Sequence, residues 1–116
     1  MNDQNHAHRV EELVGRLCWF SEPPGIRGIV RVLAIGPRPY QPRLIHAQIE
    51  VLASVSGWLL EPGSVHHVGR PRAGGYSCWF LYPLDAQTVD EAIAEVETTY
   101  PEYHGEWATT PSTGQP

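Results

Sequence analysis

Lysine is absent from this chain of 116 residues, and all eight of its basic side chains other than histidine are arginine. Arginine stays charged at physiological pH and can grip a carboxylate or phosphate with two parallel hydrogen bonds. Arginine in turn is absent after Arg72, where seven acidic residues follow. Residues 26–72 hold six arginines against two glutamates. This split predicts either that the two halves screen each other within the fold or that they face different partners.

The sequence also lacks three features that would indicate other classes of protein: a membrane span, a signal peptide and a metal-binding pattern. No apolar run approaches the ~18 residues of a membrane span, and residues 1–8 lack the basic and apolar blocks of a signal peptide. We therefore expect a cytoplasmic protein with no membrane partner. Cys18 and Cys78 fit no metal spacing, and no H-x-x-x-H pattern occurs, so we expect no metal and no cofactor. We expect both to be buried thiols, since a disulfide requires Cα atoms within ~7 Å.

The length predicts one domain with one modest core. Residues 1–9 and 109–116 are polar and too poor in apolar surface to offset the entropy of ordering. We expect two disordered tails around a globular domain of residues 10–108.

Short runs rich in β-branched and aromatic residues predict strands at residues 13–20, 28–35 and 74–83. Ser-Glu-Pro-Pro-Gly joins the first two runs and predicts a hairpin turn. Residues 36–42 contain three prolines, which predicts an irregular loop. Residues 61–64 predict a further turn.

Residues 43–60 support two interpretations. As a strand, they place Ile45, Ala47, Ile49 and Val51 on one face with a period of two. As a helix, they form one broad apolar stripe between Pro42 and Gly63. The many β-branched residues favour a strand, with a turn at residues 54–57.

The last element is predicted to be a helix over residues 89–100. Thr88 and Glu91 form a capping box, in which the hydroxyl and the carboxylate each satisfy a free backbone amide. Val89, Val96 and other apolar residues recur at helical spacing and give one apolar stripe, and Pro101 ends the helix. That stripe must pack on a sheet or on a partner.

The first half of the chain resembles small SH3-like barrels. The resemblance covers residues 12–66 and lies in the order Val-Gly-Arg-Leu-Cys-Trp, Pro-Gly-Ile-Arg-Gly-Ile-Val-Arg-Val, an alternating strand, and Gly-Trp-Leu-Leu-Glu-Pro-Gly-Ser-Val. It implies a short strand, a glycine-bounded hairpin, a long strand and an edge. Domains of this shape bind peptides, nucleic acids or other proteins, and a few are enzyme subunits.

The pattern Cys-Trp-Phe-x-x-Pro occurs twice, at residues 18–23 and 78–83. The simpler interpretation is two aromatic strand ends that contribute to one core. The alternative is an aromatic shelf for a ligand or peptide, formed by Trp19 and Trp79 on adjacent strands and extended by Trp58.

The arginines suggest an anion site. Arg27 and Arg31 point the same way on one strand, and Arg70 and Arg72 lie together in a loop. Phosphate or nucleic acid could bind such a surface. Against this, the whole chain is acidic, with a net charge of −5, so the arginines can instead be solvated or paired with the acidic helix.

Two other groups of residues are candidates. His46, His66 or His67 with Glu50 could form a pocket of a small-molecule binder or a small-barrel enzyme. Residues 100–107 combine aromatic rings with carboxylates, which suits an interface, although Trp107 could instead fold back onto the core.

The sequence carries no catalytic signature. We predict an α+β fold, with a small antiparallel sheet or partly closed SH3-like barrel of about five strands and one C-terminal helix. Two ββα units are the alternative. We expect a non-catalytic binding or adaptor protein for a protein or peptide, with Trp19, Trp58, Trp79 and the arginines as contacts. Binding of nucleic acid or another polyanion, a small-molecule pocket, and a homodimer are the alternatives.

Overall fold

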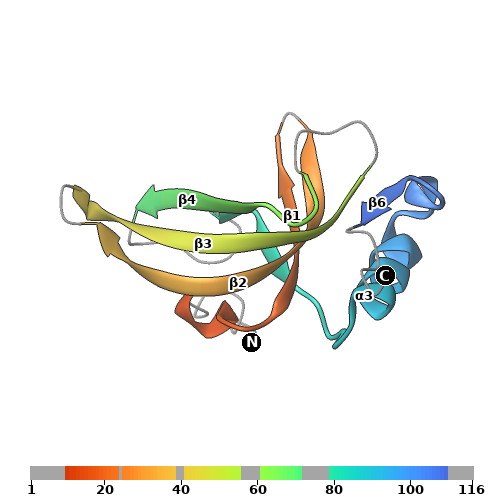
Figure 1. The fold of residues 1–116 in the computed structure, drawn as a ribbon, viewed down its shortest axis with the longest axis horizontal. Helices are drawn as coiled ribbons and strands as arrows, with labels where there is room; N and C mark the ends of the chain where they lie inside the picture. The colour runs from red at the N-terminus through yellow and green to blue at the C-terminus, as the bar shows by residue number, and fades with distance from the viewer. Residues whose placement is uncertain (1–9, 24, 39–40, 56–60, 72–78, 110–116) are drawn as a thin grey trace, which may run out of the picture.

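The computed structural model describes residues 10–23, 25–38, 41–55, 61–71 and 79–109 (Figure 1). In this part of the chain, six strands form one antiparallel sheet and one α-helix packs against it. The strands are β1 (Leu17–Glu22), β2 (Ile26–Arg38), β3 (Gln41–Val55), β4 (Val65–Pro71), β5 (Leu81–Pro83) and β6 (Trp107–Thr109). The helices are η1 (Val10–Leu13), α3 (Val89–Thr99) and η2 (Pro101–Tyr103), of which η1 and η2 are 3-10 turns. The α+β class is confirmed, and the sheet is open rather than closed into a barrel.

The sheet is built on the long hairpin of β2 and β3. Its strand order is β4-β3-β2-β1-β5, and β6 pairs with the last residues of β3. In Figure 1 the hairpin extends away from α3, which lies at the opposite end of the molecule. None of the described helices is long and apolar enough to cross a membrane.

The strand interpretation of residues 43–55 is confirmed, and the helical one, with its two ββα units, is wrong. Ile45, Ala47, Ile49 and Val51 are all buried at the predicted period of two. Residues 56–60 of that segment lie outside the described residues.

The expected irregular loop at residues 36–42 is also wrong, because β2 runs to Arg38 and β3 begins at Gln41. The pairing of the two strands shifts between Pro37 and Arg38. Such an irregularity is where a strand accommodates a proline.

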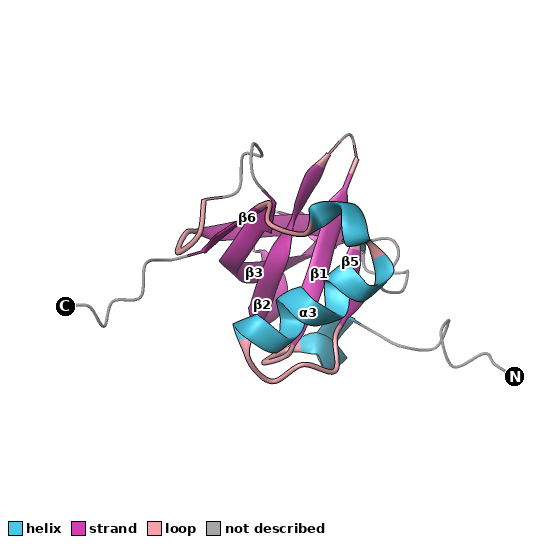
Figure 2. Ribbon diagram, turned by 90° about the vertical axis from the view of Figure 1, so that its right-hand side faces the viewer, coloured by secondary structure: helices cyan, strands magenta, loops and turns pink. Residues whose placement is uncertain are grey.

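Two buried clusters lie on opposite faces of the sheet. Alternation along β1 sends Cys18 and Phe20 to one cluster, and Leu17 and Trp19 to the other. The first cluster also contains Val10 and Leu13 of η1, and Trp79. The second lies under α3, which crosses in front of β1 and β2 in Figure 2. We call this second side the helix face.

The predicted helix is confirmed as Val89–Thr99, with its cap. The Thr88 hydroxyl accepts the Glu91 amide hydrogen at 3.2 Å. The Glu91 carboxylate accepts the amide hydrogen of Gln87, one residue before the position expected of a capping box. Ala92 and Val96 are buried against the sheet, so the apolar stripe packs within the chain.

Two strand predictions were wrong in their bounds. Leu13 belongs to η1, and Gly15 has a φ of 86°, so the first strand begins only at Leu17. The last run gives strand only from Leu81, because Phe80 has a φ of 57° and interrupts the extended backbone. Residues 74–78 of that run lie outside the described part of the chain.

The tails predicted at residues 1–9 and 110–116 also lie outside the described residues. Thr109, which we expected to begin the second tail, belongs instead to β6 and pairs with Ala53.

The cap of α3 gives a first prediction. Thr88→Ala removes the acceptor for the Glu91 amide and should lower the free energy of unfolding by about 1 kcal/mol. Thr98→Ala is the matched control, because the Thr98 hydroxyl donates only to Ala94 inside the helix, and its effect should stay within about 0.5 kcal/mol. Urea denaturation measures both. Equal losses from the two variants would show that the cap contributes nothing.

The cross-strand neighbours of His46 give a second prediction. His46 pairs with Gly36 of β2 on one side and with Gly69 of β4 on the other. A methyl group at Gly69 would lie 2.6 Å from Cε1 of His46, whereas one at Gly36 would meet nothing within 4 Å. Gly69→Ala should therefore cost about 1 kcal/mol more than Gly36→Ala in thermal unfolding. Equal stability would mean that the His46 ring does not cover Gly69.

Candidate functional site

The three tryptophans of the expected aromatic shelf do not share one surface. Trp19 belongs to the cluster under α3, and Trp79 to the cluster on the opposite face. Both are buried, with 5% and 0% of their surface exposed. The reason is the alternation of β1, which turns Trp19 away from the cluster that holds Trp79. Trp58 lies outside the described residues.

The arginines are also divided between the two faces. Arg27 and Arg31 pair with Ser21 and Leu17 of β1 and lie on the helix face. Arg70 pairs with Ile45 and therefore lies on the other face, where it donates to Glu22 at 2.9 Å. Its guanidinium also lies 5.5 Å from the centre of the Phe80 ring. Arg27, Arg31 and Arg70 thus do not form one basic surface, and Arg72 lies outside the described residues.

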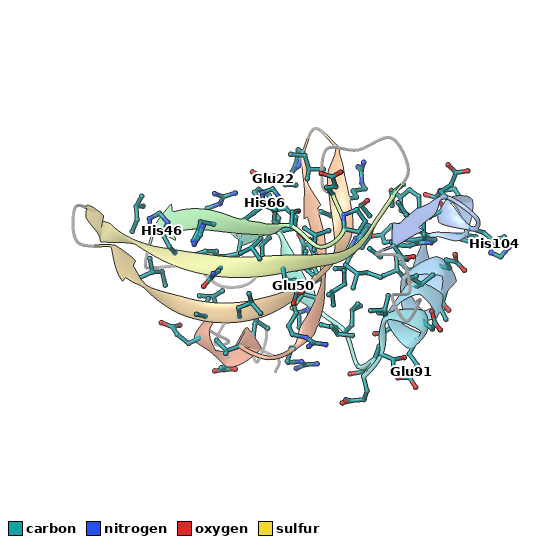
Figure 3. The ribbon with its side chains drawn as sticks, in the orientation of Figure 1. Glu22, His46, Glu50, His66, Glu91 and His104 are labelled. Atoms are coloured by element: carbon teal, nitrogen blue, oxygen red, sulfur yellow. The ribbon has the colours of Figure 1, made fainter. Side chains whose placement is uncertain are left out.

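His46, His66 and His104 lie far apart, and His67 directly follows His66 on β4. In Figure 3, His46 is near the far end of the hairpin, His66 near its middle and His104 beside α3. The described residues contain no group of three or more His, Cys, Asp or Glu side chains that could hold a metal ion. His66 contacts the Ser64 hydroxyl at 2.9 Å, and that hydroxyl also donates to the backbone carbonyl of Glu61. No histidine lines either pocket described below.

Trp107 folds back onto the molecule. It lies on β6, packs against the cluster under α3, and donates its indole hydrogen to Glu97 of α3 at 2.9 Å. Of the two roles considered for this residue, the structure shows the capping one.

An aromatic pocket lies between α3 and the β1–β5 edge of the sheet. Its volume is about 330 Å³, which is within the usual range of ligand sites. Its described lining consists of Trp19, Ser21, Tyr82, Leu84, Glu95, Val96, Thr99 and Tyr100. We call this the aromatic pocket. Strands β1 and β5 supply one wall, and the second half of α3 supplies the other.

The rings of this pocket are arranged around Trp19. Tyr82 is its cross-strand neighbour on β5, and the Tyr100 ring centre lies 6.0 Å from that of Trp19. Tyr82 and Tyr100 are 41% and 39% exposed, whereas Trp19 is buried. The pocket therefore has a buried indole at its base and two accessible tyrosines beside it.

Behind Trp19, two further rings hold it in place. Tyr103 lies 5.8 Å from it and Trp107 lies 5.9 Å from it, centre to centre. Tilted and edge-on contacts of this kind each add about 0.5–1.5 kcal/mol beyond the area they bury.

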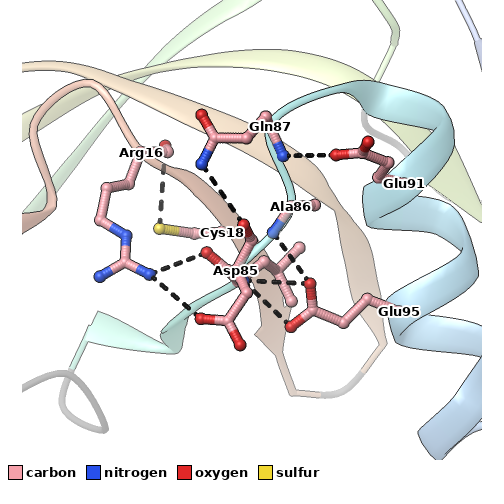
Figure 4. Close-up of polar contacts among 8 residues, drawn as sticks. Arg16, Cys18, Asp85, Ala86, Gln87, Glu91 and Glu95 are labelled. Atoms are coloured by element: carbon pink, nitrogen blue, oxygen red, sulfur yellow. Dashed lines mark hydrogen bonds and ion pairs between the residues drawn. The ribbon is translucent and has the colours of Figure 1, made fainter.

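Glu95 lines the aromatic pocket, and backbone amides of the segment before α3 fix the position of its carboxylate. It accepts hydrogen bonds from Asp85 at 3.0 and 3.1 Å and from Ala86 at 3.0 Å (Figure 4). These donors are neutral backbone amides, so the hydrogen bonds fix the carboxylate without neutralising its charge. Among the described residues that line the pocket, none is basic.

A second, polar pocket lies on the other side of Leu84, which lines both. Its volume is about 260 Å³. Its described lining consists of Gly15, Arg16, Leu17, Arg31, Leu84, Asp85, Ala86 and Gln87. We call this the arginine pocket.

The two arginines of this pocket differ in their contacts. Arg16 donates to the Leu84 carbonyl at 2.8 Å and lies 4.0 Å from the Asp85 carboxylate. The Nε of Arg31 is buried and has no hydrogen-bond partner among the described residues. A buried donor without a partner is costly, so this atom marks a place where an anionic or carbonyl group would be stabilised.

No family model, no curated protein and no solved structure matches this chain. The candidate function therefore rests on the chemistry of the two pockets.

Sequence reasoning identified Trp19 and Arg31 but missed their pocket neighbours. The pocket neighbours of Trp19 are Tyr82 on the short edge strand β5, Glu95 on α3 and Tyr100 at the C-cap of α3. Only the pairing of β5 and the packing of α3 on β1 bring them to Trp19. The one available signal was Tyr100 in the segment of aromatic and acidic residues at 100–107.

Cys18 gives a prediction about pH. Burial raises the pKa of its thiol from 9.0 to about 12, and the nearby Arg16 charge lowers it only in part. Between these pH values the unfolded chain has lost the thiol proton and the folded chain keeps it. The free energy of unfolding therefore falls as the pH rises above 9.

The expected loss from this group is about 1.4 kcal/mol at about pH 10. Cys18→Ala lacks the group, so urea denaturation at about pH 8 and about pH 10 should show the wild-type advantage over this variant shrinking by that amount. A constant difference between the two proteins would contradict the raised pKa.

Proposed function

We propose that the protein is a non-catalytic binding module that docks a protein or peptide partner in the aromatic pocket. The observation that carries this proposal is the placement of two half-exposed tyrosines beside a buried tryptophan in a concave site. Tyrosine and tryptophan dominate binding hot spots because they bury much area at a low cost in side-chain entropy.

The rigidity of the pocket base is a second argument. Trp19 is held from behind by Tyr103 and Trp107, and Glu95 by two backbone amides. A preformed site loses less entropy on binding than a site that must be ordered.

A second candidate function is binding of one anionic group in the arginine pocket. The specific observation in its favour is the buried Arg31 Nε without a described partner. This candidate is more limited than the expected binding of a nucleic acid or another polyanion. Arg70 and Arg31 lie on opposite faces of the sheet, so a polyanion that contacted both would have to cross the sheet edge.

The proposal predicts that short peptides selected for binding to the full chain will depend on the aromatic pocket. A displayed library of random linear peptides is the probe, and isothermal titration measures the selected peptides. Tyr82→Ala and Tyr100→Ala should each weaken binding about tenfold, equivalent to about 1.4 kcal/mol.

Leu33→Ala is the control, because Leu33 is an exposed apolar residue of β2 outside the pocket, 38% exposed. It should leave the affinity unchanged. Affinity that survives both tyrosine variants, or a selection that yields no binding peptide, would contradict the proposal. Light scattering of the free chain distinguishes a homodimer from a foreign partner.

A further inference from the structure

We propose that the aromatic pocket binds a positively charged side chain, an arginine or a lysine, of the partner. This inference rests on the proposed function and adds the chemistry of the group that enters the pocket. Three properties of the described lining point to a cation: its rings, its fixed carboxylate and its position at the end of the helix.

The rings provide the first argument. A guanidinium or ammonium group is attracted to the face of an aromatic ring within about 6 Å of its centre. The attraction is strongest for tryptophan, and it increases when the cation is removed from water. Trp19 of β1, Tyr82 of β5 and Tyr100 at the C-cap of α3 line one small pocket. The two tyrosines remain about two-fifths exposed, so their rings are accessible to a ligand.

The carboxylate provides the second argument. Glu95 shares the pocket with the three rings, and its position is fixed by the amides of Asp85 and Ala86. No described lining residue carries a positive charge, so a cation from outside would supply the missing counter-charge. Rings alone would accept a neutral apolar group equally well, and the carboxylate is what favours a cation.

The end of the helix provides the third argument. The pocket is lined by Glu95, Val96 and Thr99, the second half of α3, which ends at Thr99. The carbonyl end of a helix carries partial negative charge and favours cations, and the last turn of α3 contains no basic residue. The helix therefore supplies no cation of its own at its carbonyl end.

The neighbouring arginine pocket shows the opposite chemistry. It contains Arg16 and Arg31 together with Asp85, lacks aromatic rings among its described lining, and shares Leu84 with the aromatic pocket. An anionic side chain of a partner would be attracted there and repelled by Glu95.

The test uses three amino-acid amides of similar length as probes with the full chain: N-acetyl-arginine amide, N-acetyl-citrulline amide and N-acetyl-norleucine amide. Citrulline keeps the shape and hydrogen bonding of arginine without its charge. NMR titration should show the arginine probe binding about tenfold more tightly than citrulline, with shifts in Tyr82 and Tyr100.

Glu95→Gln keeps an oxygen acceptor for the two amides and removes the charge. It should weaken the arginine probe about fivefold and leave the citrulline probe unchanged. Glu102→Gln is the matched control, since it removes the same charge from η2 outside the described lining of the pocket. It should have a much smaller effect on either probe.

The outcomes separate this inference from the proposed function. Citrulline or norleucine binding as tightly as arginine would overturn the cation and leave an apolar peptide site. Equal losses from Glu95→Gln and Glu102→Gln would overturn the role of Glu95. Shifts confined to residues outside the pocket would overturn both this inference and the proposed function.

Discussion

The packing of Trp19 is the interaction on which the rest of this structure depends. Its ring contacts Tyr100, Tyr103 and Trp107, all from the last quarter of the chain, while its backbone pairs with β2 and β5. The end of α3, η2 and β6 therefore all meet at this side chain, in addition to the pairing of β6 with β3. Loss of that ring would remove the base of the aromatic pocket and the support of the helix together.

The segment from Leu84 to Gln87 is the second constraint. Arg16 holds it from the sheet side through the Leu84 carbonyl, and Glu95 and Glu91 hold it from the helix side through its amides (Figure 4). These bonds fix the segment between the two pockets, and Leu84 lines both of them. The separation of basic and acidic residues along the sequence is also seen at these pockets. Acidic α3 borders the aromatic pocket, whereas Arg31 of β2 lines the arginine pocket.

The sequence predicted those helices and strands that are determined by residues close together in the chain. Thr88, Glu91 and the apolar stripe identify α3, and the period of two from Ile45 to Val51 identifies β3. The alternation of β1 puts Trp19 and Cys18 on opposite faces, but which face α3 would cover depends on the whole topology. Phe80 has a positive φ, which makes β5 shorter than expected. Glycine is the usual residue for that conformation, so a phenylalanine at this position did not indicate it.

The site was less predictable than the fold for the same reason. Trp19 and Tyr82 are 63 positions apart and meet only because β5 pairs with β1. Glu95 and Tyr100 join them only after α3 packs on that edge. Repetition of Cys-Trp-Phe suggested a pair of equivalent tryptophans, whereas the structure gives them different faces and different neighbours.

The most direct measurement of the central claim is the position of a bound guanidinium relative to the three rings. Nuclear Overhauser contacts between N-acetyl-arginine amide and the full chain report this position. The account predicts contacts from the ligand δ-methylene protons to the Tyr82 and Tyr100 rings, with upfield ring-current shifts of those protons. Contacts to other surfaces, or bound methylene protons without ring-current shifts, would contradict it.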